Sequence, residues 1–367
     1  MLSGPWTYFN WVATPSTAAT IVFAVATAIL FVRARQHYWA LPLLPATAPS
    51  DTLADCMVVI PARNEEGVVG RAVKSFPPDS VIVVDDHSTD GTAAEASDAG
   101  AGVLEAPPLV KGASGKASAC MAGARILTSR WILFADADTR YKTGFLESAV
   151  QFAETSGLTL LSVHLTPRPK TLAEHFIEPY TTALFFSGAS VQTDPAAMFN
   201  GQCILARREA YEFLGGHAAV WKYLAEDVKL ALLAQQHHMN FGAARAGSMG
   251  YVRNYAGWKG LRSGIERNTF RFVQMNPRTG ITILITALGA ALWLPLAAWL
   301  WADGHRAAPA LLALLVILEL RPWYRRWICV LLAPLAIYAA LPMLLQGLIS
   351  ALADRPIEWK GRTARAA

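Results

Sequence analysis

The sequence has few charged residues and few cysteines. Only 16% of its 367 residues are Asp, Glu, Lys or Arg, whereas 53% are hydrophobic, and the mean hydropathy is +0.30. A chain that is soluble throughout carries more charge, so part of this one is expected in a membrane. The cysteines form no Cys-x-x-Cys pair, which argues against a zinc site or a disulfide framework and favours reduced thiols. They are Cys56, Cys120, Cys203 and Cys329.

Basic charge is also limited, and it is clustered. The net charge of +5 gathers beside apolar segments, which indicates membrane topology and not nucleic-acid binding. Residues 14–32 are almost purely apolar, no Lys or Arg precedes Arg33, and Arg35 follows closely. Because a signal peptide carries its positive charge at the front, this pattern predicts a membrane anchor over residues 1–38, with the N-terminus outside and the following chain in the cytoplasm.

The C-terminal part, residues 280–353, contains three further apolar stretches. Residues 281–301 are long enough to cross a bilayer, whereas residues 307–320 are short for a crossing. Residues 328–352 are long enough, but two prolines interrupt them. If this stretch crossed, the basic tail at 354–367 would lie outside, against the positive-inside rule. The stretch is therefore predicted either as a kinked hairpin that returns inward or as an exception to the rule.

Two stretches join these apolar ends to the middle of the chain. Residues 39–55 carry three prolines and predict a short, stiff linker. Residues 257–279 place apolar and basic side chains at helical spacing, which predicts a basic amphipathic helix resting on the anionic cytoplasmic leaflet. An ordinary surface helix is the alternative, but the membrane segment that follows directly favours the interfacial position.

The middle of the chain, residues 56–256, alternates between strand-like and helical patterns. Apolar runs at 57–60, 81–84, 103–104 and 131–135 alternate with helical spacings at 65–76, 92–99 and 115–127. This βαβα order predicts an α/β domain with a doubly wound, mostly parallel sheet. Further along, strands are predicted at 158–163 and 200–207, helices at 143–154 and 223–234, and a loop at 215–217. Residues 170–191 are equally consistent with a core segment and with a surface against lipid.

Acidic residues follow two of the strong strands. The strand at 131–135 stops at Asp136 and Asp138, and the strand at 81–84 stops at Asp85 and Asp86. Ligands of such sheets bind at the carboxyl ends of the strands. An Asp-x-Asp pair offers hard oxygen ligands to Mg²⁺ or Mn²⁺, although in isolation it is more often a capped turn. Gathered carboxylates repel one another, so a cation, a basic neighbour or a ligand hydroxyl is expected among them.

Five motifs occur in order along the domain: VVIPARNEE from Val58, VVDDHSTDGT from Val83, FADAD from Phe134, FNGQ from Phe199 and AEDV from Ala225. As an ordered set they are specific, although any one alone would be weak. The set resembles the inverting family-2 glycosyltransferases with the GT-A fold. The anchor and the C-terminal membrane segments are similar to the lipid-directed branch of that family, which includes hopanoid-associated, carotenoid-glycosylating and ceramide-glycosylating enzymes.

The resemblance implies a site for a nucleotide-diphospho-sugar donor that is linked to UDP, and the sequence does not identify its sugar. Asp86 would contact the uridine, and Lys116 would lie near the nucleotide unless it is an ordinary exposed lysine at a helix start. Asp138, with Asp136 beside it, would hold the Mg²⁺ or Mn²⁺ that neutralises charge on the leaving diphosphate. The donor-binding residues would be Pro61, Arg63, Asn64, Glu65, Asp85, Asp86, Lys116, Asp136 and Arg267.

The resemblance also implies the catalytic residue. Asp227 would be the general base that takes a proton from the acceptor hydroxyl as this oxygen attacks the anomeric carbon. Attack from the face opposite the diphosphate inverts the configuration, so no enzyme nucleophile is required. Gly216, His217 and Glu226 would lie on the acceptor side. Without the family pattern Glu226 and Asp227 are not ranked, because carboxylates in a first helical turn are also favoured by the helix dipole.

One family motif is not found in its usual place. Processive polysaccharide synthases carry Gln-x-x-Arg-Trp after the base, whereas here Arg326 and Trp327 lie between membrane segments with Trp323 at the leading position. The equivalent region is 266–270, whose Arg267 would contact the diphosphate or would belong to an ordinary basic helix. Polymerisation with export of the sugar through a channel is therefore not expected.

These features predict a multi-pass enzyme of the cytoplasmic (inner) membrane whose catalytic domain faces the cytoplasm. It would move a sugar from the nucleotide donor to a membrane lipid. Two alternatives stay open. A polyprenyl-phosphate sugar synthase would need less help from a base and more from basic side chains near the membrane. A membrane-anchored scaffold would keep the fold without turnover, which the presence of Asp86, Asp138 and Asp227 argues against.

Overall fold

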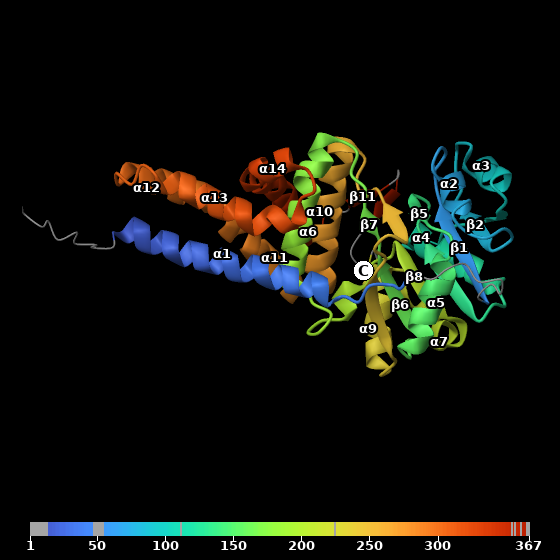
Figure 1. Cartoon of the computed structure of the whole chain (residues 1–367). Coiled ribbons are helices and arrows are strands. Elements are labelled where there is room, and N and C mark those ends of the chain that lie inside the picture. Colours follow the sequence, from blue (N-terminus) through green and yellow to red (C-terminus); the bar gives the residue numbers. More distant parts are fainter. Residues whose placement is uncertain are drawn as a thin grey trace, which may run out of the picture.

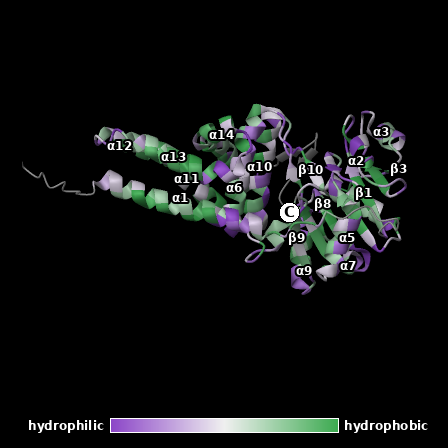
Figure 2. Ribbon diagram, in the orientation of Figure 1, coloured by the Kyte–Doolittle hydropathy of each residue, from purple (hydrophilic) through white to green (hydrophobic). Residues whose placement is uncertain are grey.

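The chain forms an α/β domain on one side and a group of long apolar helices on the other (Figure 1). The computed structural model describes residues 14–46, 55–110, 112–223 and 225–353, together with 355, 357–359 and 362–364. Figure 2 shows the contrast between the two parts: the projecting helices are mostly hydrophobic, whereas the loops of the α/β domain are mixed. This distribution is expected when one part meets lipid and the other meets water.

Seven strands form the central sheet: β1 (Cys56–Ala62), β2 (Val81–Asp85), β3 (Gly102–Glu105), β4 (Trp131–Ala135), β6 (Leu160–His164), β8 (Cys203–Arg207) and β9 (Phe241–Arg245). Their order in the sheet is β3-β2-β1-β4-β8-β6-β9. β1 to β4 are parallel, β8 is antiparallel to both β4 and β6, and β9 is parallel to β6. The predicted doubly wound, mostly parallel sheet is therefore confirmed.

Helices cover both faces of this sheet. Every residue of β4 is buried, with Leu133 in the core on one face and Ile132 and Phe134 in the core on the other. Because both faces of β4 are buried, the strand is a continuous apolar run. Asp136 and Asp138 follow directly and lie just beyond its carboxyl end. The helices are α2 (Val69–Val73), α3 (Thr92–Asp98), α4 (Gly115–Arg125), α5 (Phe145–Thr155), α7 (Arg208–Phe213), α8 (Gly216–Val220) and α9 (Glu226–Gln236).

Three short elements differ from the sequence prediction. The helix predicted at 65–76 is reduced to α2, because Asn64 and Gly67 have positive φ angles of 52° and 82° and the chain turns there. The loop predicted at 215–217 is in fact the start of α8, with Gly215 as its N-cap. The helix predicted at 223–234 begins only at Glu226. A three-stranded sheet also lies beside the main one: β5 (Thr139–Tyr141), β10 (Gly250–Val252) and β7 (Thr166–Pro167).

Three described segments, each of 26 residues, are long and apolar enough to cross a membrane: Pro15–Ala40, Pro277–Ala302 and Trp327–Leu352. The first is α1, the second comprises α11 (Pro277–Ala290) and α12 (Trp293–Ala302), and the third is α14. α13 (Ala308–Leu320) has 13 residues and so extends only about 20 Å, which is short for a crossing. α1, α12 and α13 pack together and project away from the sheet (Figure 1).

Two helices lie between the sheet and the projecting helices: α6 (Leu172–Gly188) and α10 (Gly257–Met275) (Figure 1). α6 is the stretch for which a core position and a lipid-facing position were equally expected. Its Ile177, Tyr180 and Leu184 are buried among the other helices, so this part of α6 is core.

The basic amphipathic helix predicted at 257–279 forms as α10, but protein covers its apolar face. Leu261 and Ile265 are buried in a core that α6 and α14 share with α10, whereas Trp258 is 53% exposed. The expectation that this face rests on the bilayer is therefore wrong for Leu261 and Ile265. The physical reason is that α14 packs along the same face.

α14 is one continuous helix, although Pro334 and Pro342 lie inside it. The predicted hairpin is therefore not formed. The helix packs along α10, and Gly347 allows the close approach: a Cβ at this position would lie 2.5 Å from the carbonyl oxygen of Glu266. A side chain at 347 would force the two helices apart.

Part of the stretch predicted as a linker is bound to the α/β domain. Leu43 pairs with Arg245 at the end of β9, and the backbone N–H of Arg245 donates to the carbonyl of Pro42 at 2.7 Å. The guanidinium of Arg245 also lies 4.9 Å from the ring centre of Tyr38 and 4.4 Å from that of Trp39. The end of α1 is thus held on the sheet and is not separated from it by a free spacer. Residues 47–54 of the predicted linker lie outside the described residues.

Glu174 joins the start of α6 to the start of α10. Its buried carboxylate accepts hydrogen bonds from the Arg253 guanidinium at 2.6 Å and from the backbone N–H groups of Gly257 and Lys170 at 2.7 and 2.6 Å. Burial raises the pKa of this carboxyl, but the bonds from Arg253 and the backbone outweigh it and lower the pKa to about 2.

Replacing Glu174 with Gln is expected to destabilise the protein by about 2 kcal/mol at pH 7, because Arg253, itself partly exposed, loses its charged partner. The lowered pKa means that the carboxylate stabilises fully above its ordinary pKa of 4.5 and loses this effect as the pH falls through about 2. The difference in thermal midpoint between the two proteins should therefore be constant from pH 7 to about 5 and shrink below it. Glu209→Gln, in an exposed pair with Arg207, is the control and should change little. A difference that persisted undiminished to pH 2 would contradict the assignment.

Candidate active site

A cavity of about 1500 Å³ lies at the carboxyl edge of the central sheet, between the α/β domain and the helices α6, α10, α11 and α14. One part, the polar wall, consists of residues that follow the strands and begin α4 and α9: Arg63, Asp86, Lys116, Asp136, Asp138 and Asp227. The other part, the apolar wall, consists of Phe185, Phe272, Ile283 and Leu344. The rings of Phe185 and Phe272 are 5.2 Å apart.

Most of the predicted donor-binding residues line this cavity: Pro61, Arg63, Glu65, Asp86, Lys116, Asp136 and Arg267. Asn64 and Asp85 are not among its lining residues. The side-chain oxygen of Asn64 accepts from the backbone N–H of Thr89 at 2.9 Å, and a carboxylate oxygen of Asp85 accepts from that of Ser88 at 3.3 Å. These two side chains shape the loop that follows β2, and their contact with the donor stays a prediction.

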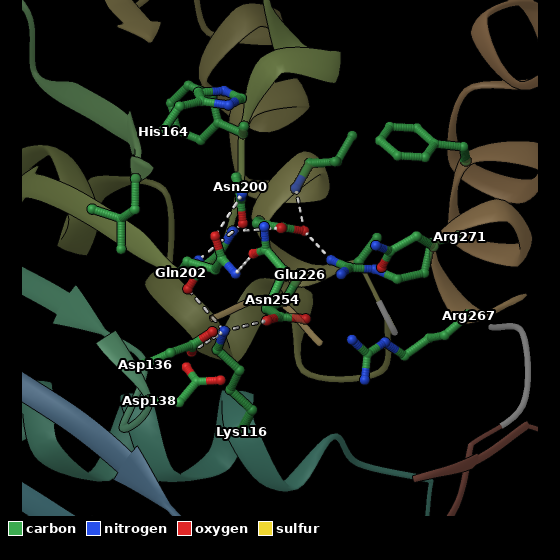
Figure 3. A pocket seen from close by; sticks show the side chains of 18 of the residues that line it. Lys116, Asp136, Asp138, His164, Asn200, Gln202, Glu226, Asn254, Arg267 and Arg271 are labelled. Atoms are coloured by element: carbon green, nitrogen blue, oxygen red, sulfur yellow. Dashed lines mark hydrogen bonds and ion pairs between the residues drawn. The ribbon is translucent and has the colours of Figure 1, made fainter. Parts of the chain in front are cut away.

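Lys116 is held in a network of carboxylates and is not an ordinary exposed lysine. Its Nζ lies 2.6 Å from Oδ1 of Asp136 and 3.7 Å from Oε1 of Glu226, and it donates to the carbonyl of Gly201 at 2.8 Å (Figure 3). Burial lowers the pKa of Lys116, but Asp136 and Glu226 outweigh it and raise the pKa above its usual value. This ammonium supplies the basic neighbour that the gathered carboxylates were expected to need.

Asp227 begins α9 on the polar wall and is 3% exposed. Its Oδ1 accepts from Nη2 of Arg271 at 2.6 Å and from the backbone N–H of Val228 at 2.9 Å, while Oδ2 accepts from the backbone N–H of Gly201 at 2.7 Å. Burial raises the pKa of Asp227. The positive charges of Arg271 and Lys116 lower it by more than burial raises it, so the net shift of the pKa is downward. The carboxylate is therefore ionised and held in one orientation.

Glu226, the neighbouring residue, shifts in the opposite direction. Burial raises its pKa, Lys116 lowers it and the charge of Asp227 raises it again, with a net upward shift. Two adjacent carboxyl groups whose pKa values are driven apart are typical of sites in which one is a base and the other holds a proton. Here Asp227 is the ionised member of the pair.

Arg271 was not predicted from the sequence. It lines the cavity one turn beyond Arg267, and Figure 3 shows both arginines on the side opposite Asp136 and Lys116. Burial and the charge of Arg271 lower the pKa of Arg267 to about 10. The available signal was Asn268-Thr269-Phe270-Arg271-Phe272, which has the order of Gln-x-x-Arg-Trp with Asn in place of Gln and Phe in place of Trp. The motif is thus degenerate at the end of α10 and not absent.

Gly216 and His217 do not line the cavity. His217 is buried beside Phe134, with Nδ1 2.8 Å from the hydroxyl of Tyr211, and burial lowers the pKa of His217 to about 3. At Gly216 the φ angle is +53°, and a Cβ would lie 2.4 Å from the Tyr211 ring. Their predicted acceptor-side position therefore does not agree with the structure, because both pack into the core beneath the site. Glu226 does line the cavity.

Asp136 and Asp138 are the carboxylates that would hold a divalent cation, and both line the cavity. Within the described ranges, no three His, Cys, Asp or Glu side chains gather as a metal site. Mg²⁺ is commonly held by only one or two carboxylates, with substrate phosphates supplying further oxygens. Because Asp136 is bonded to Lys116, the donor set fits a cation that binds together with a diphosphate, and Asp138 would be its main protein ligand.

A mostly parallel, doubly wound sheet with acidic loops at its carboxyl edge is the architecture of the GT-A fold. Residues 57–215 match the family model described as Glycosyl transferase family 2.

Two comparisons place the chain among known proteins. A 4,4'-diaponeurosporenoate glycosyltransferase of Staphylococcus aureus is 29% identical over 190 residues, which cover 47% of this chain and 49% of that protein. The match thus spans about half the length of the curated relatives. The structure of a mannosyltransferase from Pyrobaculum calidifontis, in complex with GDP-Man and Mn²⁺, superposes with a TM-score of 0.54 and 18% identity over 93% of this chain and 99% of that chain. At this identity the likeness shows the fold.

Proposed function

We propose that this protein transfers a sugar from a nucleotide-diphospho-sugar to a membrane lipid. The observation that carries the proposal is the continuity of the cavity. The same space is lined by Asp86 and Lys116 at the sheet edge and by Phe272 and Ile283 from helices beside the membrane segments. A soluble donor and an apolar acceptor can therefore meet in one site, with Asp227 in its wall. The name of the Staphylococcus aureus relative, with a diaponeurosporenoate acceptor, supports the same acceptor class.

The diphosphate of the donor would lie against the polar wall. Asp138 and Asp136 would hold Mg²⁺ or Mn²⁺, which neutralises negative charge on the leaving diphosphate when it is bound. Lys116 stays protonated between Asp136 and Glu226, so it adds positive charge on the same side. Arg267 and Arg271 add positive charge from α10, and preorganised charge of this kind lowers the barrier to departure of the leaving group.

Asp227 would act as the general base toward an acceptor hydroxyl. Its ionised carboxylate is oriented by Gly201 and Arg271, so it can take the proton while the hydroxyl oxygen attacks the anomeric carbon. The same Arg271 lowers the basicity of Asp227, and the proton transfer is therefore expected to accompany the attack and not to precede it. A single displacement of this kind inverts the anomeric configuration.

A phosphate acceptor is the second candidate, and the arginines of α10 favour it. Arg267 and Arg271 line the cavity together with Phe272 of the apolar wall, where the phosphate of a polyprenyl chain could bind. Such a phosphate is already ionised and needs no base. The two acceptors therefore differ in how strongly transfer depends on Asp227. A scaffold without turnover would have no use for this arrangement of ionised groups.

In this proposal the catalytic domain lies on the cytoplasmic side of the inner membrane. Arg33 and Arg35 follow the apolar part of α1, and Arg325 and Arg326 follow α13, so both ends carry the charge of cytoplasmic flanks. α14 packs along α10 and against α6. Like the α11–α12 segment, α14 is long and apolar enough to cross the membrane beside which this domain would lie.

The purified protein, given UDP-glucose or GDP-mannose with a lipid extract and Mn²⁺, is expected to form lipid products that are heavier by one hexose, measured by mass spectrometry. Ile283→Trp, which fills the apolar wall, should reduce this transfer by at least about tenfold and leave nucleoside diphosphate affinity unchanged. Ile285→Trp is the matched control, because Ile285 lies on the same helix but is 65% exposed. Equal transfer by both variants would exclude this wall as the acceptor site.

A further inference from the structure

A row of hydrogen-bonded side chains runs from the sheet edge to α6 along the cavity wall. Nδ2 of Asn200 donates to Oε1 of Gln202 at 3.1 Å, and Nε2 of Gln202 donates to Oδ1 of Asn254 at 2.8 Å. Nδ2 of Asn254 then donates to Oε1 of Glu178 at 2.5 Å. The three amides line the cavity (Figure 3), whereas Glu178 is 3% exposed and is not among the lining residues.

The row has one direction, and the carboxylate at its end sets it. Burial raises the pKa of Glu178 to about 7, so its carboxyl group is ionised above that pH. An ionised carboxylate only accepts hydrogen bonds, so Asn254 then turns its NH₂ group toward Glu178. The carbonyl oxygen of Asn254 then faces Gln202, which must turn its own NH₂ group toward that oxygen. At the far end, Oδ1 of Asn200 accepts from the backbone N–H of Gln202 at 3.1 Å, which agrees with the same direction.

This direction decides what the cavity wall offers to a ligand. A side-chain amide has two N–H donors and two acceptor lone pairs. In the contacts of the described residues, Gln202 uses one donor toward Asn254 and one lone pair toward Asn200. One N–H and one lone pair are left in defined positions. Neighbouring hydroxyls of a sugar ring each donate and accept, so a fixed amide can distinguish their arrangement.

Gln202 also lies close to the residues assigned to the diphosphate. Its backbone carbonyl accepts from the backbone N–H of Asp136 at 3.0 Å, because β8 pairs with β4 at this point. The neighbouring Gly201 bonds to Lys116 and Asp227. The oriented amide therefore stands between the group that would hold the diphosphate and the carboxylate that would act as base, where the sugar ring of a donor would be.

We infer that Glu178 is a positioning residue that orients the Gln202 amide, through Asn254, for recognition of the donor's sugar ring. The inference rests on the proposed function. Glu178 itself does not touch the ligand. Its contribution is that the ionised carboxylate accepts and does not donate, which makes one orientation of three successive amides more stable than the reverse.

The test is Glu178→Gln, which keeps the size of the side chain but can either accept from Asn254 or donate to it. At a pH well above 7, where Glu178 is ionised, and with the donor that the wild-type enzyme uses, this variant should lose about tenfold in kcat/KM. The Kd of the matching nucleoside diphosphate, UDP or GDP, should stay within about twofold. Glu174→Gln, one turn earlier on α6, is the matched control: it removes a carboxylate of the same helix and should lower stability without changing kcat/KM.

A double-mutant cycle separates positioning from a general structural effect. If Glu178 acts through Asn254, Asn254→Ala and Asn254→Ala with Glu178→Gln should have equal kcat/KM. Independent, multiplying effects of the two substitutions would overturn the inference. So would an unchanged kcat/KM in Glu178→Gln, or an equal loss of nucleoside diphosphate affinity. Absence of sugar transfer by the wild-type protein with every donor and acceptor would overturn the proposed function, and this inference with it.

Discussion

Replacing Asp227 with Asn is expected to reduce kcat for sugar transfer to an alcohol lipid by about a thousandfold. Asn keeps the shape of the side chain and can still accept from the backbone N–H of Gly201, but it cannot take a proton. Binding of the nucleotide sugar should change little, since Asp227 would face the acceptor hydroxyl and not the nucleotide. Initial rates of lipid glycosylation and titration with the nucleotide sugar measure the two quantities separately.

Glu226→Gln is the control for this result, because it removes a neighbouring carboxyl that faces Lys116 instead of Arg271. It should cost less than about tenfold, since this carboxyl is the one whose pKa is raised. If Glu226→Gln were the more damaging change, the base would be Glu226. If both variants transferred sugar to a polyprenyl phosphate at the wild-type rate, the acceptor would be a lipid phosphate and not an alcohol.

Removal of the divalent cation has the second large expected effect. Excess EDTA should reduce the rate of transfer by about a thousandfold or more, because no cation then neutralises the negative charge of the leaving diphosphate. Added Mn²⁺ or Mg²⁺ should restore the rate. Asp138→Ala should show a similar loss that added metal does not restore. Nucleoside diphosphate affinity is an independent measurement: in the wild-type protein it should fall on chelation, and in Asp138→Ala it should be weak with or without metal.

A control for the second prediction is Asp194→Asn, which removes a carboxylate of the same domain that bonds to Asn276 and Thr279 and lies outside the cavity lining. Its activity should respond to EDTA and to Mn²⁺ as the wild type does. Full transfer in excess chelator would remove the metal from the reaction and leave Lys116 and the arginines of α10 as the charges that act on the diphosphate.

Much of the α/β domain could be predicted because its signals are local. β4 is buried on both faces and is therefore written as five consecutive apolar residues, after which Asp136 and Asp138 must stand at the sheet edge. The parallel order of β1 to β4 brings Asp86 to the same edge. The helical period at 257–275 likewise predicted α10. These conclusions need only the periodicity of the sequence and the rule that the carboxyl ends of parallel strands lie at the same edge of a sheet.

The partners of these residues could not be predicted, because helices that are distant along the chain bring them together. Arg271 meets Asp227 across 44 positions, and Glu178 meets Asn254 across 76. Hydrophobic period alone did not show that α14 would cover the apolar face of α10, so that face was expected on lipid. His217 was placed near the acceptor by its position in the sequence, and the packing of Tyr211 around it decided otherwise.

The sequence by itself determined the doubly wound sheet, the acidic loops at its edge and the apolar segments at both ends, since strand period, burial and length are properties of short stretches. The tertiary structure alone decided which charge stabilises which carboxylate and which side chains form the apolar wall of the cavity. The physical reason is that ion pairs and hydrogen bonds act over a few ångströms, and only the docking of α6, α10 and α14 against the sheet brings their atoms that close.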